Sequence, residues 1–82
     1  MLGLYVEVER HTTDGRMDIL VQTKDYVYIF ELKIDKSADK ALRQIEDKQY
    51  ALPFESDKRK LYKIGINFST STGRMNDWKI KT

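Results

Sequence analysis

The sequence predicts an α/β protein in which a mixed sheet of four or five strands carries one main helix. Several short segments rich in Val, Ile, Tyr and Phe alternate apolar with polar side chains, which is typical of strands. One longer segment places its apolar side chains at helical spacing. In chain order the expected elements are β-β-β-α-β. Because the chain has only 82 residues, residues 1–82 are expected to form a single domain.

The first three strands are expected at residues 4–11, 16–22 and 26–34. Between the first two strands, Asp14-Gly15 is a strong turn signal within residues 12–15. The second and third strands are expected to form a hairpin that closes at Thr23-Lys24. The third strand is nearly continuous in apolar residues, which indicates a central strand covered on both faces.

The helix is expected over residues 37–52, with Ser37 as its N-cap and Pro53 directly after its end. Its buried stripe is expected to consist of Ala38, Ala41, Leu42, Ile45, Gln49 and Leu52. A fourth strand is expected at residues 61–68, and the strand–helix–strand order favours a right-handed crossover. Residues 77–81 alternate weakly and are expected to form a short fifth strand at an edge.

Three charged residues interrupt the apolar strands of the hairpin: Asp18, Glu31 and Lys33. A charge in a buried strand costs free energy unless it is paired or binds a metal ion. Glu31 and Lys33 lie two residues apart and therefore share a face of the sheet. The hairpin is expected to bring Asp18 close to Glu31, so that two carboxylates and an ammonium converge. The alternative interpretation is a cross-strand ion pair with Lys33 or Arg16.

This constellation resembles the PD-(D/E)xK nuclease superfamily, with Asp18 followed by Glu31-Leu32-Lys33 as the E-x-K element. The wider wording, GRMDILV, YVYIFELK and ALRQIEDKQYA, is similar to small nuclease-like domains attached to AAA-ATPase-like proteins in bacteria. The resemblance covers residues 5–68 and implies a restriction-endonuclease-like core. It also implies that Asp18, Glu31 and the carbonyl of Leu32 bind Mg²⁺ or Mn²⁺, with Lys33 beside the attacking water.

The resemblance further indicates residues that contact the substrate. Gln44, on the helix, is expected to face the metal site. RecB-like relatives carry a tyrosine four residues after this glutamine, whereas here that position is Lys48 and the tyrosine is Tyr50. On an ideal helix Tyr50 points away from Gln44, and both Lys48 and Tyr50 are candidates for binding nucleic acid. A basic patch, which a solvated loop explains equally well, consists of Lys58, Arg59, Lys60 and Lys63.

The sequence departs from the superfamily at its start. The superfamily core is usually α-βββ-α-β, but the first helix, which covers one face of the sheet and often carries an acidic residue, is missing here. Glu7 or Glu9 could replace that residue, although a solvated strand face is the favoured interpretation of the pair. The face left open carries Tyr26, Tyr28, Phe30 and Leu32. Either the chain is a fragment, or a second copy covers that face, or the site is incomplete. Because an open apolar face favours association, a homodimer formed through this face is expected.

Two functions are compatible with the sequence. The first is a metal-dependent nuclease acting on nucleic acid, with DNA as the expected substrate, and the intact Asp-Glu-Lys set favours it. The alternative is a catalytically inactive nuclease-fold module that binds nucleic acid or protein beside an ATPase, and the missing helix favours it. An AAA-ATPase-like domain is an expected partner. The chain has no cysteine, secretory signal or apolar run of ~18 residues, so a cytoplasmic protein without membrane association is expected.

Overall fold

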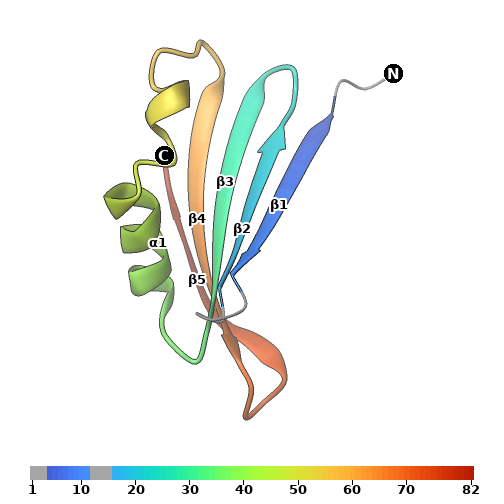
Figure 1. The fold of residues 1–82 in the computed structure, drawn as a ribbon, viewed down its shortest axis with the longest axis vertical. Coiled ribbons are helices and arrows are strands. Elements are labelled where there is room, and N and C mark those ends of the chain that lie inside the picture. Colours follow the sequence, from blue (N-terminus) through green and yellow to red (C-terminus); the bar gives the residue numbers. More distant parts are fainter. Residues whose placement is uncertain (1–3, 12–15) are drawn as a thin grey trace.

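The computed structural model describes residues 4–11 and 16–82, and it confirms a five-stranded mixed sheet with one helix. The elements are β1 (Tyr5–His11), β2 (Arg16–Gln22), β3 (Tyr26–Ile34), α1 (Ala38–Asp47), η1 (Leu52–Phe54), β4 (Lys60–Ser69) and β5 (Arg74–Lys81). The strand order in space is the order in sequence, β1-β2-β3-β4-β5 (Figure 1). The turn predicted at residues 12–15 lies outside the described residues. None of the helices in the described part of the chain could span a membrane.

The crossover from β3 through α1 to β4 makes these two central strands parallel, while the other three strand pairs are antiparallel. The predicted fifth strand was too short, because β5 begins at Arg74 rather than at residue 77. Gly73, with φ of 69°, donates its backbone N–H to the Ser69 carbonyl at 2.8 Å and closes a tight turn. Pairing with β4 then continues along the polar start of β5, which the alternation of apolar residues did not reveal.

The main helix is shorter than predicted, because it ends at Asp47 and not at residue 52. Its N-terminus is as predicted, since the Ser37 side chain accepts a hydrogen bond from the backbone N–H of Lys40. Gln49 adopts a positive φ of 54°, which reverses the chain three residues before the predicted end. Gln49 and Leu52 are consequently exposed and do not extend the buried stripe. Pro53 lies in η1 and does not terminate α1.

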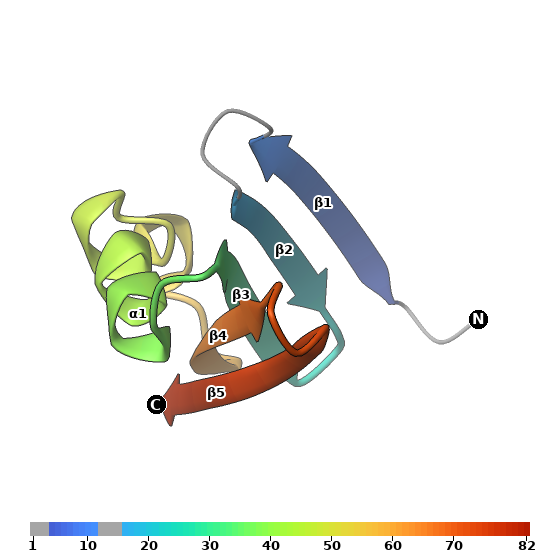
Figure 2. The same ribbon diagram turned by 90° about the horizontal axis from the view of Figure 1, so that it is seen from below.

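The helix covers one face of the sheet, as the end-on view shows (Figure 2). The buried core on this face consists of Val27, Ile29, Ile45 and Ala51. The contact between helix and sheet is closest at Gly65 of β4, the strand partner of Glu31. A Cβ atom on Gly65 would lie 2.5 Å from the Ala38 carbonyl oxygen and 2.9 Å from the Leu42 backbone nitrogen. Glycine at this position therefore allows α1 to pack closely on β4, next to the strand that carries Glu31.

The opposite face of the sheet is covered by no element among the described residues (Figures 1 and 2). Rows of paired side chains cross it, and the middle row, which passes through the centre of β3, consists of Val8, Ile19, Phe30, Ile64 and Ile80. Tyr28 and Tyr62 stack on this face with their ring centroids 5.4 Å apart. Trp78 and Ile80 on β5 remain 62% and 60% exposed. The prediction that one face lacks cover thus holds for the described chain.

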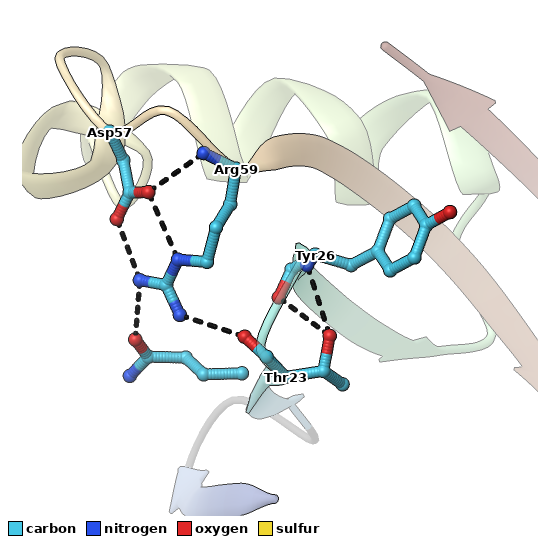
Figure 3. Close-up of polar contacts among 5 residues, drawn as sticks. Thr23, Tyr26, Asp57 and Arg59 are labelled. Carbon is cyan, nitrogen blue, oxygen red and sulfur yellow. Dashed lines mark hydrogen bonds and ion pairs between the residues drawn. The ribbon is translucent and has the colours of Figure 1, made fainter. Parts of the chain in front are cut away.

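An arginine clamp joins the loop before β4 to the β2–β3 turn (Figure 3). Both oxygens of Asp57 accept hydrogen bonds from the Arg59 guanidinium, at 2.9 and 2.6 Å. The same guanidinium donates to the Thr23 carbonyl at 3.1 Å and to Gln22 Oε1 at 2.9 Å. Hydrogen bonds from Arg59 lower the pKa of Asp57 to about 2. The clamp fixes the end of the hairpin that lies away from Asp18 and Glu31.

Candidate functional site

Asp18 and Glu31 lie directly opposite each other on the antiparallel strands β2 and β3, as predicted. The hairpin closes at Lys24-Asp25, one residue later than expected, with the Thr23 backbone N–H donating to the Tyr26 carbonyl at 2.9 Å. Side chains that face each other across an antiparallel ladder have Cβ atoms about 4.5–5.5 Å apart. The two carboxylates therefore occupy neighbouring positions on the face of the sheet that α1 covers.

The Glu31 side chain is fully buried, with 0% of its surface exposed. Neither of its carboxylate oxygens has a hydrogen-bond partner among the described residues. The Nε of Arg16 lies 3.8 Å from Glu31 Oε1, close enough for charge attraction but too far for a charge-assisted hydrogen bond. A buried carboxylate without hydrogen bonds is costly, and such groups are usually paired or bound to a metal ion.

Lys33 follows on the same face, and α1 supplies its partner. The Lys33 ammonium donates a hydrogen bond to Gln44 Oε1 at 3.5 Å. Both side chains are half-buried. The structure thus gathers around one position the four residues that the sequence singled out as catalytic, which are Asp18, Glu31, Lys33 and Gln44.

Tyr50 also lies at this site, although an ideal helix continuing to residue 52 would direct its side chain away from Gln44. Because the chain reverses at Gln49, the Tyr50 side chain returns to line a cleft with Asp18. Burial raises the pKa of the Tyr50 hydroxyl, and the charge of Asp18, which accepts a hydrogen bond from it, raises this pKa further. The positive charge of Arg16 and a hydrogen bond with Gln44 lower the pKa of Tyr50. Gln44 therefore connects Lys33 on one side to the Tyr50–Asp18 pair on the other.

A cleft of about 130 Å³ opens beside the carboxylates. Its lining consists of Glu7, Glu9, Asp18, Ile19, Leu20, Ile29, Tyr50 and Phe54. Glu9 on β1 is the strand partner of Asp18, but its side chain is exposed. In the part of the chain that the structure describes, no three His, Cys, Asp or Glu side chains gather closely enough to hold a metal ion.

The basic residues suggested for binding nucleic acid lie away from the carboxylates. Lys60 is the strand partner of Tyr26, whereas Gly65, five residues further along β4, is the partner of Glu31. At the usual rise of a strand this separation is about 16 Å. The Lys60 ammonium lies 5.6 Å from the centre of the Tyr62 ring. The structure therefore does not bring the patch before β4 to the site.

The other basic candidates are engaged in different ways. The Arg59 guanidinium makes the hydrogen bonds of the clamp, and the Lys63 ammonium pairs with Glu46 at 2.8 Å. Lys58 is exposed in the loop before β4. Lys48 is also exposed, at the C-cap of α1 and one turn beyond Gln44. Lys48 is therefore the basic candidate that lies on the same element as the site.

Comparison with known proteins identifies the family. The family model for the PD-(D/E)XK nuclease superfamily matches residues 1–78, which is nearly the whole chain. The chain belongs to the PD-(D/E)XK nuclease superfamily. It is also 37% identical over 70 residues to an uncharacterized protein in the vnfD 5′ region of Azotobacter chroococcum mcd 1. The match covers 83% of this chain but only 14% of that protein. No solved structure gave a significant match.

Membership of the PD-(D/E)XK superfamily makes a divalent metal ion the expected cofactor, and the residues present fit one. Carboxylate oxygens are the ligands that Mg²⁺ and Mn²⁺ prefer, and the buried Glu31 carboxylate lacks hydrogen bonds from the described protein. The sequence predicts Arg16 only as an alternative ion-pair partner, whereas the structure places it beside Glu31 in the site. Its position two residues before Asp18, on the same face, was a sufficient signal.

Proposed function

We propose that this PD-(D/E)XK domain is a metal-dependent nuclease that hydrolyses phosphodiester bonds in nucleic acid, with DNA as its expected substrate. The observation that carries the proposal is the fully buried Glu31 carboxylate, which has no hydrogen-bond partner among the described residues and lies opposite Asp18. Arg16 approaches this carboxylate without donating a hydrogen bond to it, so the carboxylate oxygens are suited to binding a metal cation.

Asp18, Glu31 and the backbone carbonyl of Leu32 would hold Mg²⁺ or Mn²⁺. Mg²⁺ is commonly bound by one or two carboxylates, with water and substrate phosphate as its remaining ligands, so two carboxylates are sufficient. The bound ion would lower the pKa of a water molecule and neutralise negative charge on the scissile phosphate.

The remaining polar residues act on the water and on the phosphate. The Lys33 ammonium, oriented by its hydrogen bond to Gln44, would position the attacking water and offset the charge that develops on the phosphoryl oxygens. Because its pKa is raised, the Tyr50 hydroxyl keeps its proton at neutral pH and remains a donor to Asp18. Tyr50 and Gln44 would therefore fix the orientation of Asp18 and Lys33.

The proposal is tested by measuring Mn²⁺-dependent cleavage of DNA by the purified protein. Removing a single charge-stabilising group from such a site typically lowers the rate by about 100-fold or more, so Asp18→Asn and Lys33→Met should each have at least this effect. Lys40→Met, an exposed change on α1, is the matched control and should cleave at the wild-type rate. Cleavage that survives in both Asp18→Asn and Lys33→Met would refute the assignment.

A second candidate is a catalytically inactive nuclease-fold module that binds nucleic acid or protein beside an ATPase. The Arg16–Glu31 contact favours it, because an internal cation can partly compensate the carboxylate. This candidate predicts a folded protein that binds DNA and neither retains Mn²⁺ nor cleaves. An association with an AAA-ATPase-like domain is supported by the sequence resemblance alone.

For the open face of the sheet we propose a second copy of this chain as the partner. Its middle row is apolar from β1 to β5, and it is uncovered in the described structure. A surface that is apolar across its whole width binds charged ligands poorly. The same surface of a second copy can pack against it in a two-fold dimer. Because α1 lies on the other face, such a dimer would leave both candidate sites accessible.

A further inference from the structure

The contact between Arg16 and Glu31 is an ion pair without a hydrogen bond. The Arg16 Nε lies 3.8 Å from Glu31 Oε1, whereas charge-assisted N–H···O bonds are typically about 2.7–2.9 Å long. Both side chains are buried, with 11% and 0% of their surfaces exposed. The guanidinium therefore compensates the charge of Glu31 through space while the oxygens of the carboxylate remain available to another ligand.

Arg16 lies close enough to the other residues of the site for its charge to act on them. It is the first residue of β2 and the strand partner of Lys33, and it shares a face with Asp18. Its charge also lowers the pKa of Tyr50, which places it within electrostatic reach of the Tyr50–Asp18 pair. Arginine does not lose its proton in proteins, so this charge is present at every pH of interest.

A divalent ion held by Asp18 and Glu31 would repel this guanidinium. Like charges repel at short range, so a divalent ion on these carboxylates and the Arg16 guanidinium beside them oppose each other's binding. Arg16 is the first residue of β2, and displacement of its side chain would leave the backbone pairing of β2 with β3 unchanged.

We propose that Arg16 is an internal counter-ion that holds the metal-free site together and is displaced when the divalent ion binds. This inference rests on the proposed function, because it requires that Asp18 and Glu31 bind the ion. It explains how the metal-free chain tolerates a fully buried Glu31. It also predicts that Arg16 weakens metal binding, unlike the residues that hold the ion.

The test compares wild type with Arg16→Met, which keeps the length of the side chain but removes its charge. Mn²⁺ binding is followed by the loss of the electron paramagnetic resonance signal of free Mn²⁺. Thermal unfolding is measured in EDTA and in saturating Mn²⁺. Arg74→Met, an exposed arginine on β5, is the matched control and should behave as wild type in both measurements.

Arg16→Met should bind Mn²⁺ about tenfold more tightly, because it removes a positive charge that repels the ion at short range. It should unfold at a lower temperature than wild type in EDTA, and Mn²⁺ should raise its melting temperature by more than it raises that of wild type. Arg16→Lys keeps the charge and should bind Mn²⁺ with the affinity of wild type. It provides the comparison if Arg16→Met fails to fold. If Arg16→Lys binds Mn²⁺ tenfold more tightly than wild type, the proposal is overturned.

Three results contradict the inference. If Arg16→Met binds Mn²⁺ with unchanged or weaker affinity, while wild type binds it through Asp18, Arg16 does not compete with the ion and only this inference fails. If Arg16→Met loses the same stability in EDTA and in Mn²⁺, the role of Arg16 is purely structural. If wild type and Asp18→Asn alike fail to bind Mn²⁺, the proposed function fails together with the inference.

Discussion

Tyr50 shows how a single residue depends on the backbone before it. The sequence placed its side chain away from Gln44, because the helix was expected to continue to residue 52. The positive φ of Gln49 ends the helix early and turns Tyr50 toward Asp18. A Gln with a positive φ carries no distinctive local signal, since glycine is the residue usually found there. The contact was therefore beyond prediction from spacing alone.

The raised pKa of Tyr50 has a consequence for stability in alkali. Because the folded protein holds this proton more tightly than the unfolded chain, the contribution of the hydroxyl to stability is complete below pH 10. It is lost as the pH rises through the higher folded pKa. The difference in free energy of unfolding between wild type and Tyr50→Phe should accordingly be constant from pH 7 to pH 9 and shrink above pH 10. A difference that grows with pH would show that burial and Asp18 do not raise the pKa of Tyr50 in the folded protein.

The charged residues within apolar strands were the informative ones at this scale. Asp18, Glu31 and Lys33 could be paired correctly because strands have a strict period of two and the hairpin fixes their register. Gln44 could be added only through the family resemblance. The hydrogen bond between Lys33 and Gln44 depends on how closely α1 approaches the sheet, which no local pattern encodes.

At the scale of elements, that approach is set by Gly65. Replacing Gly65 by Ala would drive a methyl group into the backbone of α1 at Ala38 and Leu42. Overpacking of this kind typically costs about 1–3 kcal/mol, and it would also move Gln44 away from Lys33. Denaturant titration should show this loss, together with reduced cleavage.

The matched control is Gly73→Asn, in an exposed turn where an added Cβ meets nothing within 4 Å and where asparagine tolerates the positive φ. It should lose less stability than Gly65→Ala and should keep the wild-type rate of cleavage. Equal stability of Gly65→Ala and wild type would mean that the helix is free to shift.

The lengths of elements were predicted less well than their existence. The ends of strands in which apolar and polar side chains alternate strongly were predicted nearly to the residue. This alternation arises because one face of such a strand is buried and the other is not. The start of β5 was missed because its pairing with β4 follows from the tight turn at Gly73 and not from its own apolar pattern. Its side chains are almost all exposed, so the sequence shows little periodicity there.

At the scale of the whole molecule, the uncovered face of the sheet governs assembly. Trp78→Glu replaces a side chain that is 62% exposed, so the folded monomer should lose little, whereas a dimer interface would gain a buried charge. Wild type should sediment at micromolar concentration with twice the 9.7 kDa mass of the chain, and Trp78→Glu should sediment as a monomer.

Leu52→Glu, at a residue of η1 that is 55% exposed, is the control for this change and should leave the mass unaltered. A cooperatively folded wild-type monomer at the same concentration would exclude the dimer. The sequence could predict an open face because the central strand is apolar on both of its faces, and one helix covers only one of them. It could not say what covers that face, because an apolar surface alone does not specify its partner.

Asp18 and Glu31 are proposed to bind one divalent ion, and the anomalous scattering of crystals of this protein soaked in Mn²⁺ tests this directly. We expect one strong peak in contact with a carboxylate oxygen of each residue, at distances of about 2.1 Å. We also expect that the Arg16 side chain has moved away from Glu31. Crystals that show no such peak, with Arg16 still beside Glu31, would refute the proposed metal site.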